Sequence, residues 1–185
     1  MNDAKGTPHR EFDWLEGTYW YVPAADLPAM QYDAARNTLA WIVDQTVWHI
    51  TGYHDGYFWG VCSVLVHDAG EEVPSCGRGA RPTGLALLGS ITPEGSVHLT
   101  FVPGAALTSR SATIGIGRAI EHEGGIALEM QMSTGTIERT AHWAYMMQTR
   151  PGDPSWDSLP GVGRSVPEML DGIDPPAVEP AGNSS

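Results

Sequence analysis

Hydrophobic and polar residues alternate along most of the chain, in short segments separated by residues typical of turns. Alternation with a period of two indicates β-strands, because successive side chains of a strand point to opposite faces. The pattern predicts strands over residues 18–22, 38–43, 46–53, 57–66, 83–91, 97–102, 111–121, 126–133 and 138–149.

Short turn sequences join most of the predicted strands. Asp55-Gly56 is a typical two-residue hairpin turn, and Thr92–Ser96 and His122–Gly125 each place glycine between two predicted strands. Eight or nine strands joined mainly by tight turns form an up-and-down meander, which most often closes into a barrel. We therefore expect an all-β fold, an antiparallel up-and-down β-barrel of eight or nine strands.

The two ends of the chain add only short helices. Phe12–Gly17 predicts one helical turn, and Ser165-Val-Pro-Glu168 is a capping box that predicts a short helix over 165–171. We expect one barrel domain over residues 12–172, between a flexible N-terminus (1–11) and a disordered tail (173–185). Residues 67–82 show no periodicity and predict a long loop.

Charge and cysteine content narrow the range of partners. The net charge is −12, and Lys5 is the only lysine, so a basic surface for nucleic acid or for an anionic membrane is not expected. The chain has no run of 18 apolar residues and no visible signal peptide. Cys62 and Cys76 are too few for a disulfide framework, so we expect free thiols and a cytoplasmic location.

The aromatic composition suggests a pocket for a small molecule. The chain has seven Trp and six Tyr but only three Phe. Trp and Tyr combine an apolar body with a hydrogen-bonding tip, which suits a pocket for an aromatic or hydroxylated ligand. The alternative is that these side chains simply fill the core of the barrel, or that an exposed group of Trp forms a homodimer surface.

Motifs for cofactors and metals are not found. Gly115-Ile-Gly117 lies within a predicted strand and lacks the third glycine of a dinucleotide-binding loop. The histidines lack the close spacing of common metal sites, and no P-loop, nucleophile elbow or CxxC pair is present. We therefore expect neither a cofactor nor a metal.

Several strands have one apolar face and one mixed face. Trp48 and Ile50 share one face of their strand, whereas His49 and Tyr53 lie on the other. Glu129 and His142 lie on mixed faces of two later strands. If the mixed faces line the lumen, an acid and a histidine in an apolar cavity are suited to proton transfer; if they face water, they are ordinary surface residues.

Two resemblances to known families follow from particular segments. Gly17-Thr-Tyr-Trp20 on the first strand, with Arg150 after the last, resembles the calycin (lipocalin-like) barrels, which implies that Trp20 packs under Arg150. Trp41-Ile-Val-Asp44-Gln45-Thr-Val47, with Asp55-Gly56-Tyr57 and Thr92–Ser96, resembles bacterial phenolic acid decarboxylases. Those are small calycin barrels that decarboxylate hydroxycinnamic acids without a cofactor.

The second resemblance implies roles for several residues. Tyr19 and Tyr21 correspond to the tyrosines that hold the substrate, and Asp55 lies near the place of the catalytic carboxylate, although Asp55 is also expected as a hairpin residue. The place of the substrate-binding arginine is held by Ala40, so Arg139 or Arg118 would have to replace it.

The sequence therefore predicts a small aromatic or hydrophobic ligand in the barrel and leaves two functions open. One is a cofactor-independent lyase or isomerase acting on a phenolic molecule, and the other is a carrier or sensor that binds without reaction. The candidate catalytic residues are Tyr21, His49, Asp55, Glu129 and His142. The candidate substrate-binding residues are Tyr19, Trp41, Tyr53, Trp59, Met130, Arg139 and Tyr145.

Overall fold

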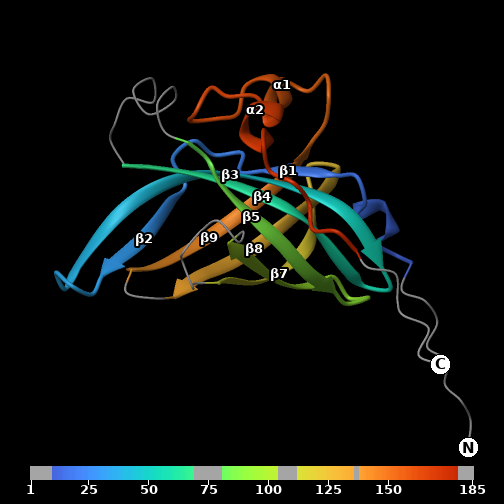
Figure 1. The fold of residues 1–185 in the computed structure, drawn as a ribbon. Helices are drawn as coiled ribbons and strands as arrows, with labels where there is room; N and C mark the ends of the chain where they lie inside the picture. The colour runs from blue at the N-terminus through green and yellow to red at the C-terminus, as the bar shows by residue number, and fades with distance from the viewer. Residues whose placement is uncertain (1–9, 69–80, 104–111, 136–137, 179–185) are drawn as a thin grey trace, which may run out of the picture.

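The computed structural model describes residues 10–68, 81–103, 112–135 and 138–178, which form a β-barrel with a small helical segment on its outside (Figure 1). The described ranges begin with a short 3₁₀ helix, η1 (Asp13–Leu15). The strands are β1 (Tyr19–Tyr21), β2 (Pro28–Asp33), β3 (Thr38–His54), β4 (Tyr57–Asp68), β5 (Thr83–Ile91), β6 (Ser96–Pro103), β7 (Thr113–His122), β8 (Gly125–Gly135) and β9 (Glu138–Thr149). The helices are α1 (Pro154–Asp157) and α2 (Val166–Leu170).

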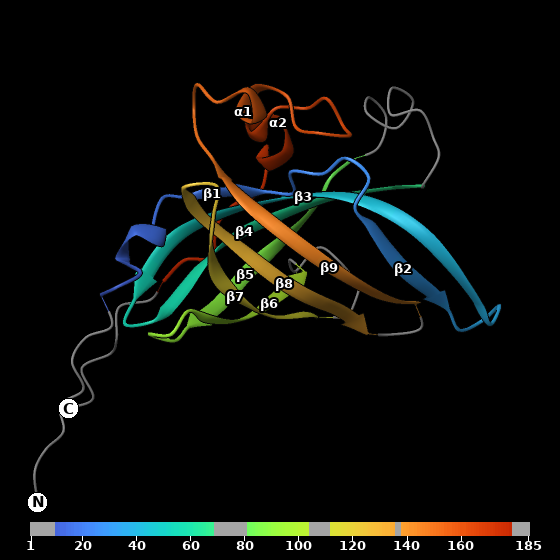
Figure 2. The ribbon, with the colours of Figure 1, turned by 180° about the vertical axis from the view of Figure 1, so that it is seen from behind.

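The strands form one closed antiparallel sheet, which confirms the predicted all-β barrel. Each strand from β2 to β9 pairs with the next along the chain, and β2 also pairs with β9, which closes the barrel (Figure 2). The architecture is consistent with a calycin-like barrel. The expectation that Trp20 packs under Arg150 is wrong. The side chain of Arg150 is 85% exposed and lies beside Asp153 instead of covering Trp20.

β1 and β2 occupy the same place in the barrel, between β3 and β9. Tyr21 of β1 is opposite Val47 of β3, and Pro28 of β2 is opposite Val43. Residues 22–27 leave the sheet between them, so residues 44–46 of β3 have no partner strand on that side. The two strands are thus one interrupted strand of an eight-stranded barrel.

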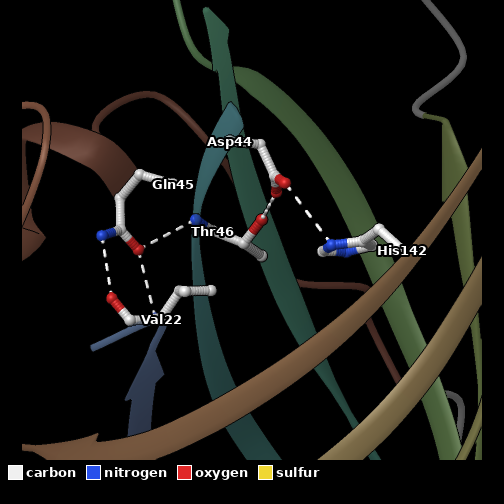
Figure 3. A network of polar contacts seen from close by, with 5 residues as sticks. All are labelled: Val22, Asp44, Gln45, Thr46 and His142. Atoms are coloured by element: carbon white, nitrogen blue, oxygen red, sulfur yellow. Dashed lines mark hydrogen bonds and ion pairs between the residues drawn. The ribbon is translucent and has the colours of Figure 1, made fainter. Parts of the chain in front are cut away.

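The side chain of Gln45 fills this interruption (Figure 3). Its Oε1 accepts hydrogen bonds from the backbone N–H of Val22 (3.1 Å) and of Thr46 (3.0 Å). Its Nε2 donates to the carbonyl oxygens of Val22 (3.0 Å) and Pro160 (2.9 Å). Buried backbone groups need such partners, so the amide of Gln45 stabilises the break in place of a strand.

The core of the barrel consists of the inward faces of the strands. Trp20, Trp48, Ile50, Leu87 and Met130 are fully buried there. Phe12 packs at the edge of this cluster and η1 contributes Leu15, at the end of the barrel where β3 finishes. The inward faces are therefore the apolar faces of the strands, and most of the mixed faces point outward.

The segment after β9 packs on the outside of the barrel over β3 and β4. Leu159, Val166 and Met169 of this segment form a buried cluster with Val47 and Leu65. The predicted capping box is confirmed, since Ser165 accepts from the backbone N–H of Glu168 while the Glu168 carboxylate accepts from the backbone N–H of Ser165. The outward side chains at the middle of β3 are thereby buried.

Some element boundaries differ from the prediction. Residues 38–54 form one continuous strand in place of two, and β2 was not predicted. β4 extends to Asp68, so the predicted loop begins later. Parts of this loop and of the predicted termini lie outside the described residues: 69–80, 1–9 and 179–185. None of the helices in the described part of the chain has the length and hydrophobicity that a membrane-spanning helix needs.

Candidate functional site

One end of the barrel lumen contains a cavity of about 350 Å³, at the end where β5, β7 and β9 begin. Ligand pockets in proteins typically have volumes of ~300–1,000 Å³, so this cavity suits a small molecule. Its walls are mainly apolar, with Ile42, Val64, Leu85, Phe101 and Met132. Its polar lining includes Gln31, Asp44, Thr46, Thr140 and His142.

The strand register brings Asp44 and His142 into this cavity. Asp44 and Thr46 lie on the same face of β3 as the buried Trp48 and Ile50, so they point inward. His142 shares the inward face of β9 with Ala144 and Met146. β2 lies between β3 and β9 beside this cluster. Its inward residue there is Ala29, which is paired with both Ile42 and His142. Its small side chain leaves room for His142 to approach Asp44.

Asp44, Thr46 and His142 form a buried polar cluster (Figure 3). The Thr46 hydroxyl donates to Asp44 Oδ2 at 2.6 Å, and His142 Nδ1 lies 3.5 Å from Asp44 Oδ1. The side chains of Asp44 and His142 are only 9% and 10% exposed. Within the described residues, His142 Nδ1 is buried and has no hydrogen-bond partner. The cluster is therefore tightly enclosed but incompletely hydrogen-bonded.

Cys62 also lines the cavity and is a free thiol. Burial raises its pKa well above the ordinary value, and the nearby Asp44 carboxylate adds to the effect. A thiol is a good nucleophile only as the thiolate, so Cys62 is not activated in this setting. Across the described ranges, no three His, Cys, Asp or Glu side chains lie close enough together to hold a metal ion.

Of the residues proposed from the sequence, only His142 lines the cavity. Met130 points inward but is part of the packed core. Tyr53 is buried at the opposite end of the barrel, next to the β3–β4 hairpin, and burial raises its pKa. Neither side chain lines the cavity with His142, so the lumen does not bring these three residues together.

Three further candidates lie on the outside of the barrel, beneath the C-terminal segment. Tyr19 and Tyr21 pack against the cluster that contains Val47 and Leu159. The His49 ring stacks on that of Tyr19, with centroids 4.0 Å apart. Burial lowers the pKa of His49. The sequence left open which face of this strand lines the lumen, and the structure turns His49 outward, because the inward face of β3 carries Trp48 and Ile50.

The remaining candidates also lie away from the cavity. Asp55 has a φ of 46° and Gly56 a φ of 86°, so the pair forms the β3–β4 hairpin turn. Glu129 accepts a hydrogen bond from Arg118 Nε (2.8 Å) on the outer surface. The rest are outward-facing side chains that do not line the cavity: Trp41, Trp59, Arg139 and Tyr145.

Sequence reasoning missed Asp44 and Thr46. The prediction placed Asp44 in a break between two strands, where an acid is unremarkable. The useful signal is that Asp44 and Thr46 have the same parity as Trp48 and Ile50, so a continuous strand places all four on one face. An aspartate on the apolar face of a long strand indicates a buried carboxylate.

Comparison with known proteins does not add a function. No family model matches the chain, and neither a curated protein nor a solved structure is significantly similar to it. The case for a function therefore depends on the cavity and its polar cluster.

Proposed function

We propose that the protein binds a small, largely apolar aromatic molecule in the barrel lumen, with a polar group of the ligand at Asp44 and His142. The observation that carries this proposal is the enclosed Asp44–Thr46–His142 cluster in a mainly apolar cavity of about 350 Å³. A few polar groups in an apolar pocket orient a ligand, while the apolar walls supply most of the binding free energy.

The proposal extends to cofactor-independent chemistry on the bound molecule. A histidine beside a carboxylate is a common general acid–base arrangement, because the carboxylate stabilises the protonated imidazole. His142 and Asp44 form such a pair, with Nδ1 of the histidine 3.5 Å from Oδ1 of the aspartate. His142 would remove a proton from a phenol or from an acidic C–H of the ligand and return it at another atom, as an isomerase or lyase requires.

Isomerisation fits the cavity better than decarboxylation of a hydroxycinnamic acid. The resemblance to phenolic acid decarboxylases implies an arginine that holds the substrate carboxylate. None of the described lining residues is Arg or Lys, and Asp44 would repel a second carboxylate. A proton transfer within a phenolic molecule that carries no carboxylate needs no such cation.

A carrier or sensor is the second candidate. It is favoured by the lack of an activated nucleophile in the described lining: burial keeps the Cys62 thiol protonated, and the Thr46 hydroxyl donates to Asp44. Barrels of this architecture are compatible with either role, so the site and not the fold must decide.

Binding in the lumen is tested with a variant that fills the cavity. Thr140 lines the cavity, so Thr140→Trp should abolish binding of hydroxylated aromatic probes measured by calorimetry. His98→Trp is the control, since His98 is exposed on the outer surface of β6 and does not line the cavity. Equal binding by wild type and Thr140→Trp would show that the lumen is not the site.

Catalysis is tested separately with His142→Phe. Absorbance changes of the same probes measure turnover. An enzyme should lose rate by ~10²-fold or more, whereas a carrier should keep or gain affinity for an apolar ligand. Absence of turnover by wild type with any bound probe would contradict the enzymatic form of the proposal and leave the carrier.

A further inference from the structure

The carboxylate of Asp44 has few partners for a group so deeply buried. Its side chain is 9% exposed, and in the described part of the chain it receives one hydrogen bond, from Thr46, and has His142 Nδ1 at 3.5 Å. An ionised carboxylate has about four acceptor positions. Burial of a charge without compensating donors is unfavourable, so this side of the cavity has unused capacity for a donor.

His142 does not complete the site. Its Nδ1 approaches Asp44 Oδ1, but the geometry is not that of a hydrogen bond, and the atom has no other partner among the described residues. Both side chains line the cavity. The two groups therefore lie beside each other without satisfying each other, and Asp44 faces a space that a ligand can enter.

The charges around the cavity favour a cation in that space. No Arg or Lys belongs to the described lining, so the imidazole of His142 is the basic side chain that the described lining places beside Asp44. Those arginines of the described residues that form ion pairs do so outside the cavity, as Arg118 does with Glu129 on the outer surface. The net charge of −12 adds a long-range attraction for cations.

We infer that the polar group of the ligand is a protonated amine, and that the lumen selects small aromatic amines over alcohols and carboxylic acids of the same size. This inference rests on the proposed function, because it takes the lumen as the binding site. An ammonium group donates up to three hydrogen bonds and pairs with the Asp44 charge, whereas a hydroxyl donates one. Phe101 and Met132 supply apolar contact for the aromatic ring.

The test compares three probes of nearly equal shape by isothermal titration calorimetry at pH 7.5: 2-phenylethylamine, 2-phenylethanol and 3-phenylpropanoate. Wild-type protein should bind the amine at least ten-fold more tightly than the alcohol, and the acid most weakly. Asp44→Asn keeps the shape of the side chain and removes its charge. It should lower the affinity for the amine at least ten-fold and change that for the alcohol by less than three-fold.

Asp26→Asn is the matched control, because it removes the same charge from an exposed residue between β1 and β2. It should leave all three affinities unchanged. An alcohol that binds wild type as tightly as the amine overturns the inference and leaves the proposed function intact. Failure of all three probes to bind folded wild type overturns both. The wild-type comparison decides the inference even if Asp44→Asn does not fold.

Discussion

His49 and His142 both lie within strands of the barrel, but their surroundings give them different roles. His142 points into the lumen beside a carboxylate, whereas His49 points outward and is covered by Tyr19, which in turn contacts Trp156 of the C-terminal segment. Burial without an acidic partner favours the neutral imidazole, and this lowers the pKa of His49. His49 therefore links stability to pH without taking part in the proposed site.

His49→Phe should make the protein less sensitive to acid. The unfolded chain binds a proton at His49 near pH 6.5, while the folded state binds it only at lower pH. The contribution of His49 to stability is thus complete above pH 6.5 and is lost as the pH falls through the folded pKa. Melting temperatures between pH 7.5 and 5.5 should fall less steeply in His49→Phe than in wild type.

The control for this prediction is His98→Phe, since His98 is exposed on β6. It should show the wild-type decline in melting temperature. An identical decline in His49→Phe and wild type would contradict the assigned role of His49.

The orientation of individual side chains was the part of the site that the sequence could not supply. Alternation assigns residues to two faces of a strand but does not say which face is inside. Trp48 and Ile50 point inward because apolar surface is buried first, and this turns His49 outward on the same strand. His142 is inward because it shares a face with Ala144 and Met146.

Among the elements, the hairpins were the most predictable. Strands β5 and β9 begin and end at the predicted residues, because each is an alternating segment bounded by residues with strong turn preferences. β2 was missed because it begins at Pro28 and lies directly after another proline-bounded connection. β3 was divided in two because Asp44 and Gln45 are unusual in a buried strand, and their roles depend on β1, β2 and β9.

Close approach of β3 and β4 depends on Gly60. A Cβ at this position would lie 1.9 Å from the carbonyl oxygen of His49, which is a backbone atom and cannot rotate away. Gly60 pairs with Ile50, directly beside the bulge in β3 between Ile50 and Gly52. The glycine thus permits the local bend of the longest strand.

Gly60→Ala should destabilise the protein by about 3 kcal/mol or more, because overpacking against fixed backbone forces the strands apart. Urea unfolding followed by circular dichroism measures the loss, and failure to obtain folded protein is the extreme form of the same result. Gly125→Ala is the control, since its nearest neighbour would be 3.8 Å away. Equal midpoints for Gly60→Ala and wild type would refute the role of this contact.

At the scale of the whole molecule, the outer surface has an unusual apolar row across neighbouring strands. Trp41 is opposite Met30, and the row continues through Ala141 of β9 and the one polar residue, Ser133 of β8, to Ile114 of β7. Trp41 and Ile114 are 64% and 59% exposed. Exposed apolar patches of this kind usually mark an interaction surface. The row contains no acidic side chain, so two copies of a strongly acidic chain can meet there without opposing carboxylates.

The homodimer suggested by the sequence is still a prediction, and we place its contact on this row. Light scattering after size exclusion should give twice the monomer mass for wild type, and Trp41→Gln should shift the protein toward monomer. Tyr57→Gln, at a residue equally exposed on the β3–β4 hairpin, should not. A wild-type protein that stays monomeric at all concentrations would rule out this contact.

The interruption between β1 and β2 also determines where extra residues can be inserted into the chain. Gln45 holds the backbone at the start of the gap and anchors it to Pro160. Ala25 and Asp26 are exposed there. Extra residues at this point would lengthen a surface loop and leave every strand pairing in place. The gap is therefore a natural position for grafting a peptide or a reporter onto the barrel.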